Sequence, residues 1–155
     1  MAVKTKALLN DRKNVELLKL LQREPRTTVA ELARRVGMSG PAVKERVLRL
    51  EESGIIEAYR LALSPKALGY GVMAFIRVRP MSGRTAKVTA LVKSMPEVTE
   101  CHRVTGEDCF VLKVYVKEMA QLERLVDQLL LHGDTTTSIV QSTPIPPRSL
   151  PINDA

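Results

Sequence analysis

The chain has 155 residues, and its 24 Lys and Arg against 17 Asp and Glu give a formal net charge of +7. Apolar residues make up 45% and aromatic residues only 3%, so we expect a globular core of aliphatic side chains. The sequence lacks an apolar run of the roughly 20 residues that a membrane span needs, and MAVKTKALLNDRKN lacks the apolar core of a secretion signal, so we expect a cytoplasmic protein with no membrane contact.

Positive charge is concentrated in the first 60 residues, which hold 13 basic and 8 acidic residues. The rest of the chain holds 11 basic and 9 acidic residues. A basic segment of this kind is typical of a surface that contacts a polyanion such as double-stranded DNA. The alternative is a solvated basic surface, which many globular domains carry. Charge alone leaves both interpretations open.

A first helix is predicted near the start of the chain. Asn10 or Asp11 can cap it, and leucines then follow at helical spacing as far as Glu24. Pro25 ends the pattern, because proline cannot continue a helix from within.

Two more helices follow with a short corner between them. The sequence Thr28-Val-Ala-Glu31 has the form of a capping box, in which the hydroxyl and the carboxylate each satisfy a free amide of the first turn. Gly37 fits the left-handed end of this second helix, and Ser39 fits the cap of a third helix from about Gly40 to Ser53. A break of about three residues is the length of a helix-turn-helix corner.

The third helix has two contrasting faces. Val43, Val47 and Leu50 point to one side and anchor the helix, while Pro41, Lys44, Glu45 and Leu48 point to the other side, with Arg46 and Arg49 on the flanks. In a helix-turn-helix the first turns of the second helix reach base edges in the major groove. The candidate DNA-binding residues are therefore Ser39, Gly40, Pro41, Lys44, Glu45, Arg46, Leu48 and Arg49, together with Arg34 and Arg35 of the preceding helix.

Each side chain suggests a separate task at the DNA. Lys44 can bond guanine, Glu45 can accept from cytosine, and Leu48 can pack on a thymine methyl group. The arginines suit phosphates, which position a protein without reading sequence. Two alternatives stay open: the whole face is only a solvated surface, or Arg46 is a structural partner of Glu51 or Glu31.

The pattern changes after the third helix. Residues 55–63, IIEAYRLAL, suggest a strand or wing, and residues 61–70 suggest a hinge. Beyond it, periodicity predicts a strand over 72–79, a helix over 85–94, strands over 98–105 and 109–117, a helix over 118–131 that Gly133 ends, and a strand over 135–142. Residues 144–155 are a Pro-rich tail that we expect to be extended.

The order βαββαβ in the second half is that of a ferredoxin-like antiparallel sheet with both helices on one face. The predicted fold class is therefore α+β, a winged helix-turn-helix followed by a ferredoxin-like domain. The expected boundaries are 1–60 for the DNA-binding domain, 61–70 for the hinge, 71–143 for the second domain and 144–155 for the tail. The sheet face that carries Met73, Phe75 and Tyr115 is a candidate dimer interface.

Catalytic and metal-binding patterns are scarce. The only histidines are His102 and His132, and a Gly-rich phosphate loop and a G-x-S-x-G motif are both missing, so we expect neither an enzyme nor a cofactor. The two cysteines, Cys101 and Cys109, are expected to be buried and reduced. They lie near His102 without the spacing of a zinc site, so no metal is predicted.

At this point the sequence resembles the leucine-responsive/asparagine-regulator (Lrp/AsnC) family of prokaryotic transcription factors, over roughly residues 10–143. The resemblance rests on ELARRVGMS, ERVLRLEESGIIEAY and LSPKALG in the first part. In the second part it rests on VTECHRVTGEDCFVLKVYV and TTTSIV. The chain departs from the family pattern at Asn14, where an acidic residue is usual, and after Asp108, where Cys109 and Phe110 often stand as Asp and Tyr.

The resemblance implies a DNA-binding regulator of amino-acid-related metabolism with a ligand-sensing domain. Such domains pair through their sheets into dimers, and dimers assemble further to tetramers or octamers. Small effectors, commonly amino acids, bind between dimers near a Gly-x-Asp turn, which Gly106 and Asp108 match. The candidate effector-binding residues are Thr105, Gly106, Glu107, Asp108, Thr135, Thr136 and Thr137. A plain β-turn is the simpler explanation of the same glycine and aspartate.

Two alternatives to a sequence-specific regulator remain. A free-standing ligand sensor that regulates an enzyme would lack the helix-turn-helix, which this chain has. An architectural protein that wraps DNA with little sequence choice would share every basic residue. Only comparison of specific and random DNA separates it from a sequence-specific regulator.

Overall fold

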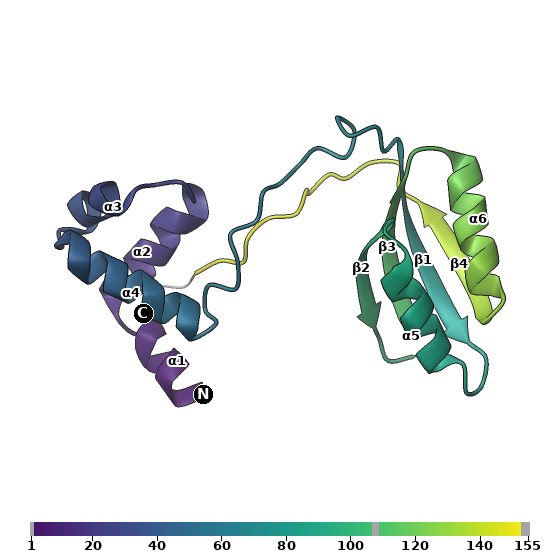
Figure 1. The fold of residues 1–155 in the computed structure, drawn as a ribbon, viewed down its shortest axis with the longest axis horizontal. Coiled ribbons are helices and arrows are strands. Elements are labelled where there is room, and N and C mark those ends of the chain that lie inside the picture. Colours follow the sequence, from purple (N-terminus) through teal and green to yellow (C-terminus); the bar gives the residue numbers. More distant parts are fainter. Residues whose placement is uncertain (1, 107–108, 153–155) are drawn as a thin grey trace. The chain divides into compact units, whose positions relative to one another are not determined.

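The computed structural model describes residues 2–106 and 109–152, which fall into two compact units (Figure 1). Unit 1 consists of Met1–Leu61 together with Ile145–Ala155, and unit 2 is Ala62–Pro144. The sequence predicted a separate tail over residues 144–155. In the structure the segment from Ile145 instead belongs to the same unit as the first 61 residues.

Unit 1 is helical. Its elements are α1 (Ala2–Leu9), α2 (Arg12–Arg23), α3 (Val29–Val36) and α4 (Gly40–Glu52). The last three confirm the predicted helices, whereas α1 was not predicted. The expected caps are also in place: the side chains of Asp11, Thr28 and Ser39 each accept a backbone hydrogen bond from the first turn of the helix that follows. Gly37 ends α3 in the left-handed conformation, with φ of 65°.

The core of unit 1 forms where α2, α3 and α4 meet. Leu17, Leu32 and Val43 are at most 2% exposed, and the partly buried Val47 packs against the same cluster. Leu50 of α4 is fully buried as well. The predicted inner face of the third helix is therefore confirmed, and burial of these aliphatic side chains fixes α4 on its neighbours.

Residues 55–63, where a strand or wing was expected, do not form a strand in the structure. The Ile56 amide instead donates to the carbonyl of Leu50, which turns the chain back against the end of α4. A strand needs a neighbouring strand to pair its backbone groups, and the elements of unit 1 described here are all helices.

Unit 2 is a four-stranded antiparallel sheet with two helices. Its elements are β1 (Val72–Pro80), α5 (Thr85–Ser94), β2 (Val98–Arg103), β3 (Phe110–Val116), α6 (Met119–Leu130) and β4 (Gly133–Ile139). The strand order β2-β3-β1-β4 is that of the predicted ferredoxin-like arrangement. The predicted element order is confirmed, although β2 ends before Thr105 and β4 begins and ends earlier than expected.

Both helices pack on one face of this sheet. Alternate residues of β1 and β3 form a core with side chains of α5 and α6: Ala74, Ile76, Val78, Leu112, Val114, Val116, Val88, Val92, Leu122, Leu125 and Leu129. The other face carries Met73, Phe75 and Tyr115, and Phe75 is 40% exposed. In the described part of the chain, no helix is long and apolar enough to cross a bilayer.

Gly133 does not end α6 as predicted. The helix ends at Leu130, and Gly133 is instead the first residue of β4, paired with Pro80. A Cβ atom on Gly133 would lie 2.2 Å from the Arg79 carbonyl oxygen. Close approach of the two backbones is therefore what requires glycine here.

Candidate nucleic-acid interface and ligand-binding turn

The outer face of α4 is open to solvent. Pro41, Lys44 and Leu48 are exposed, and Leu48, a large apolar residue, is 50% exposed. Val43 and Leu50 on the opposite face are fully buried, which holds the helix rigidly while the outer face stays free. Ser39 and Gly40 lie at the start of the helix, where the Ser39 hydroxyl is occupied by the Ala42 amide.

The arginines and the acid on the flank of α4 are held by ion pairs. Arg49 donates to Glu45 one turn away at 2.5 Å. Arg46 donates to the carboxylate of Asp11 at 2.5 Å and to the side-chain oxygen of Asn14 at 2.8 Å. Arg46 thus has a structural role, but its partners are not the predicted Glu51 or Glu31.

Glu51 and Glu31 have other partners. Glu51 accepts a hydrogen bond of 2.9 Å from the Tyr59 hydroxyl. Partial burial and this hydrogen bond raise the pKa of Tyr59 to about 12. Glu31 binds two arginines of its own helix, Arg34 at 2.7 Å and Arg35 at 2.7 Å.

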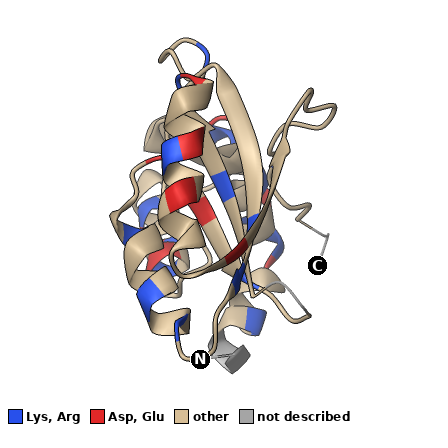
Figure 2. Ribbon diagram, turned by 90° about the vertical axis from the view of Figure 1, so that its right-hand side faces the viewer, with Lys and Arg blue, Asp and Glu red and all other residues tan. Residues whose placement is uncertain are grey.

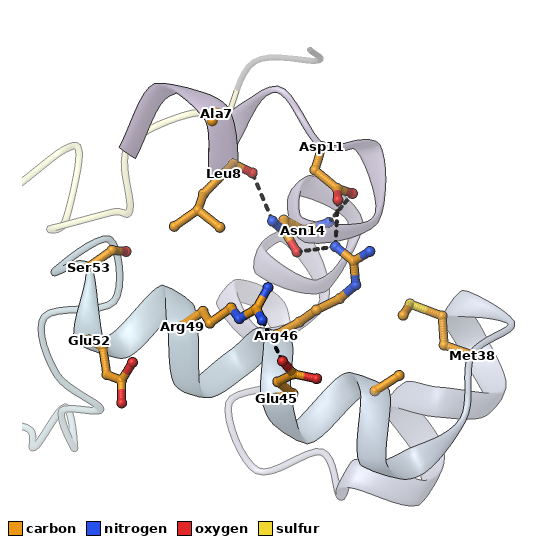
Figure 3. Close-up of a pocket in the computed structure, with 11 residues that line it drawn as sticks. Ala7, Leu8, Asp11, Asn14, Met38, Glu45, Arg46, Arg49, Glu52 and Ser53 are labelled. Atoms are coloured by element: carbon orange, nitrogen blue, oxygen red, sulfur yellow. Dashed lines mark hydrogen bonds and ion pairs between the residues drawn. The ribbon is translucent and has the colours of Figure 1, made fainter. Parts of the chain in front are cut away.

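Asn14 is the buried polar residue at the junction of three helices (Figure 3). It is 2% exposed, and its amide NH₂ donates to the Leu8 carbonyl at 3.0 Å while its oxygen accepts from Arg46. One side chain of α2 therefore bonds the end of α1 on one side and α4 on the other. A buried amide with both ends satisfied stabilises a single arrangement of its neighbours.

A cleft of about 880 Å³ lies between α1 and the flank of α4. Ala7 and Leu8 line it from α1, and Glu45, Arg46 and Arg49 line it from α4 (Figure 3). The predicted DNA-binding residues are thus divided. Pro41, Lys44 and Leu48 lie on the open face of α4. Glu45, Arg46 and Arg49 instead face a cleft that α1 helps to form.

Arg34 and Arg35, the remaining candidates, are engaged with acids on the surface. Arg35 bridges Glu31 to Glu24, with 2.9 Å between Arg35 Nη1 and Glu24 Oε1, and so connects α3 to the end of α2. The hydrogen bonds from Arg34 and then Arg35 lower the pKa of Glu31 to about 2. Figure 2 shows that acidic and basic positions are interspersed along the helices.

The predicted effector turn lies between β2 and β3. Thr105 and Gly106 are exposed, and Gly106 has φ of 116°, a conformation that favours glycine. Glu107 and Asp108, the acidic candidates, lie outside the described residues. The turn closes with Val104 donating to Cys109, whose own amide donates to Val78 of β1.

The three threonines lie on β4, at the edge of the sheet. Val78 of β1 pairs with Phe110 on one side and with Thr135 on the other. Phe110, which follows the turn, therefore lies at the same end of the sheet as Thr135. The strand β1 lies between these two residues and separates them by about 10 Å, or two strand spacings. Thr136 pairs with Arg77 on the open face, whereas Thr137 pairs with Ile76, which faces the helices.

The cysteines differ from the prediction in one respect. Both are free, but Cys101 is exposed, so its expected burial is wrong, and Cys109 is partly buried. Over residues 2–106 and 109–152, no group of three or more His, Cys, Asp and Glu side chains is placed to hold a metal ion.

Asp11 and Asn14 were not predicted as partners of Arg46. A signal for Asn14 was present, because its position falls on the stripe of α2 that also carries the buried Val15, Leu17, Leu18 and Leu21. A polar residue within a buried stripe needs hydrogen-bond partners, and an arginine on a packed helix is a natural one.

Sequence families match both halves of the chain. Residues 10–57 match the winged helix-turn-helix DNA-binding family, and residues 73–150 match the Lrp/AsnC ligand binding domain. The HTH-type transcriptional regulator YezC of Bacillus subtilis is 37% identical over 86% of this chain and 94% of its own length. The leucine-responsive regulatory protein of Salmonella typhimurium is 33% identical, with 84% of each chain covered.

Solved structures show the same fold. A transcriptional regulator of Neisseria meningitidis, solved as a complex with L-Met, has a TM-score of 0.85 and 33% identity over 92% of this chain and 97% of its own. AsnC of E. coli has a TM-score of 0.82 and 31% identity over 90% and 97%. These relatives are transcriptional regulators and not enzymes. The chain therefore belongs to the Lrp/AsnC family of helix-turn-helix transcriptional regulators.

Proposed function

We propose that this protein is a sequence-specific DNA-binding regulator of amino-acid-related metabolism that works as a dimer or larger assembly and responds to an amino acid. The observation that carries the DNA-binding half is the rigid presentation of α4. Its inner face is fully buried at Val43 and Leu50, while Lys44 and Leu48 are exposed on the outer face. In a helix-turn-helix, that is the arrangement that reads the major groove.

The open face of α4 supplies the base contacts in this proposal. Lys44 bonds guanine and Leu48 packs on a thymine methyl group. Ser39, Gly40 and Pro41 bring the start of the helix close to the bases. Glu45, Arg46, Arg49, Arg34 and Arg35 stand beside this face in ion pairs, so they contact cytosine or phosphates only where a paired carboxylate is exchanged or shared.

The second part of the proposal is assembly through the open sheet face. Met73, Phe75 and Tyr115 form an apolar strip on a sheet face that the helices of unit 2 leave uncovered. In this proposal the two α4 helices of a dimer enter successive major grooves, about 34 Å apart. A tetramer or octamer built from such dimers would engage several half-sites.

An amino acid is the effector that the comparisons favour, because a relative with 33% identity was solved with L-Met. The proposed site includes Thr105, Gly106, Glu107 and Asp108 of the turn, with Thr135, Thr136 and Thr137. In one chain β1 lies between the turn and β4. We therefore place the effector where the turn of one chain meets β4 of another, so that binding changes the assembly and, through it, DNA occupancy.

In this proposal residues 1–60 are the DNA-binding domain, 61–70 the hinge, 71–143 the effector and assembly domain, and 144–155 a tail. Since the partner is chromosomal DNA, the protein acts in the cytoplasm. Neither a metal nor a cofactor has a part in it.

Two measurements test the proposal. Fluorescence anisotropy should show tighter binding to the protein's own upstream region than to random DNA of equal length. Equal affinity for both would favour an architectural DNA binder. A thermal-shift screen of the twenty amino acids, followed by DNA binding with each hit, tests the sensor. If no amino acid changes either assembly or DNA affinity, the sensing half is wrong.

The dimer interface has a test of its own. Phe75→Glu places a charge on the uncovered strip and should shift light-scattering mass at micromolar concentration toward the monomer, with the fold unchanged by circular dichroism. A matched control is Lys93→Glu, at an exposed position of α5. A wild-type protein that is already monomeric would remove this part of the proposal.

A further inference from the structure

We infer that α1 is an accessory DNA-binding element that contacts the phosphate backbone, and that Asn14 is the positioning residue that docks it beside α4. This inference rests on the proposed DNA-binding function of α4. It assigns a second surface, outside the helix-turn-helix itself, to the same duplex.

Asn14 has the chemistry for this docking. Its NH₂ group donates to the carbonyl of Leu8, in the last turn of α1, at 3.0 Å. Carbonyls of a last helical turn have no partner within their helix, so this bond satisfies a group that would otherwise need water. Its oxygen accepts from Arg46 of α4 at 2.8 Å, and the side chain is 2% exposed.

A carboxylate at this position could not form both bonds. It would accept from Arg46 equally well, but it has no proton to donate to the Leu8 carbonyl. Two oxygens would then face each other at hydrogen-bond distance in a buried site. The amide is therefore the feature of this chain that holds α1 against α4.

Charge identifies the partner that α1 fits. Its sequence, AVKTKALL, has two lysines and no acidic residue, and Lys6 is exposed. The neighbouring flank of α4 offers little free positive charge, because Arg46 is paired with Asp11 and Arg49 with Glu45. A phosphate beside this flank would thus be attracted chiefly by α1. Two helices that share one cleft are close enough to follow the same DNA strand.

The salt dependence of DNA binding tests the contact. Each phosphate contact adds about 0.9 to the slope of log K against log salt, so Lys6→Gln should flatten the slope by about one. It should weaken specific and random DNA alike, by roughly eightfold at 0.1 M salt relative to 1 M. Lys93→Gln removes the same charge from an exposed position on α5 and should change neither. An unchanged slope for Lys6→Gln would overturn the inference.

A double-mutant cycle tests the role of Asn14. Asn14→Asp should weaken DNA binding to the same degree as deletion of residues 2–9, and should have no further effect in the deletion background. A full additional loss there would mean that the new charge or Arg46 is responsible, and would overturn the docking role.

Hydrogen exchange gives an independent readout without DNA. The amides of α1 should lose protection in Asn14→Asp while those of α2 and α4 keep theirs. Retained protection in α1 would contradict the docking. If the unaltered protein bound no DNA, both the proposed function and this inference would fail, whereas wild-type binding with an unchanged Lys6→Gln slope removes the inference alone.

Discussion

Arg46 and Asp11 lie 35 positions apart in the sequence and join α4 to the start of α2, with 2.5 Å between Arg46 Nη1 and Asp11 Oδ2. Asp11 also caps α2 by accepting from the amides of Lys13 and Asn14. A single carboxylate therefore fixes the start of α2 and the middle of α4. Its removal should affect the orientation of α4 as well as stability.

Arg46→Ala should lower the free energy of unfolding by about 1–3 kcal/mol, because it leaves the buried oxygen of Asn14 without a donor. Urea unfolding at pH 7 measures the change. Arg12→Ala is the control, since Arg12 is an exposed arginine of the first turn of α2. A loss equal to that of the control would contradict the role of the junction.

The same pair should make stability depend on pH. The hydrogen bond from Arg46 lowers the pKa of Asp11 below its ordinary value of 3.8. A lowered pKa gives stability that is present above the ordinary value and is lost as the pH falls through the lowered one. The gap in unfolding free energy between wild type and Arg46→Ala should therefore be wide at pH 7 and should narrow as the pH falls below 3.8 and through the lowered pKa. A constant gap would show that Asp11 does not titrate with the pair.

Glu31→Gln should strengthen binding to random DNA. The Glu31 carboxylate holds Arg34 and Arg35, and with a pKa of about 2 it remains ionised across the pH range of a binding assay. Neutralising it frees the Arg34 guanidinium for a phosphate, while Arg35 keeps its ion pair with Glu24. Affinity should therefore rise several-fold and the salt slope should steepen. Glu57→Gln, an exposed acid of the same unit, controls for net charge. Equal gains in the two variants would mean that only net charge matters.

Gly133→Ala should destabilise unit 2. The added methyl group would lie 2.2 Å from the Arg79 carbonyl oxygen and 2.7 Å from the Cα of Pro80. Backbone atoms must move to make room, which we expect to cost about 3 kcal/mol, the upper part of the range for overpacked sites. Thermal unfolding measures it. Gly40→Ala should be close to neutral, because a Cβ there meets nothing within 4 Å.

Lys44→Ala and Arg49→Ala should differ in kind. Loss of Lys44 from the open face should alter which DNA sequence is preferred, by about 1–3 kcal/mol at one base position. If Arg49 exchanges Glu45 for a phosphate when DNA binds, its loss should weaken all DNA about equally and flatten the salt slope. A selection from randomised DNA, followed by anisotropy at several salt concentrations, separates the two. An unchanged sequence preference in Lys44→Ala would remove that residue from the base-reading set.

Most of the elements were predictable because their signals are local. The caps at Thr28 and Ser39 and the alternation in β3 depend only on neighbouring residues, so the sequence alone predicts each of them. The order of the second half then leaves one common way to pair four strands with two helices on one face.

What could not be predicted depends on contacts between distant parts of the chain. The N-terminal helix α1 has neither an apolar stripe nor a capping residue, and a bond from Asn14 contributes to holding it. The partners of Arg46 come from α2 because packing of α4 brings them there, while Glu51, a near neighbour, is turned toward Tyr59. The strand predicted over residues 55–63 is absent for a related reason. Periodicity shows that a segment can form a strand, but it does not show that a second strand is present to pair with it.

The Gln22 side chain donates to the Leu150 carbonyl at 2.8 Å, and Ile152 beside it is partly buried in a groove lined by Leu18 and Leu21. Residues of unit 1 therefore come from both sides of unit 2 in the chain. During synthesis the ribosome releases the first helices long before their last partners, because all of unit 2 must be translated in between. A newly made helix-turn-helix thus lacks its contacts with Leu150 and Ile152 until the whole of unit 2 has been translated.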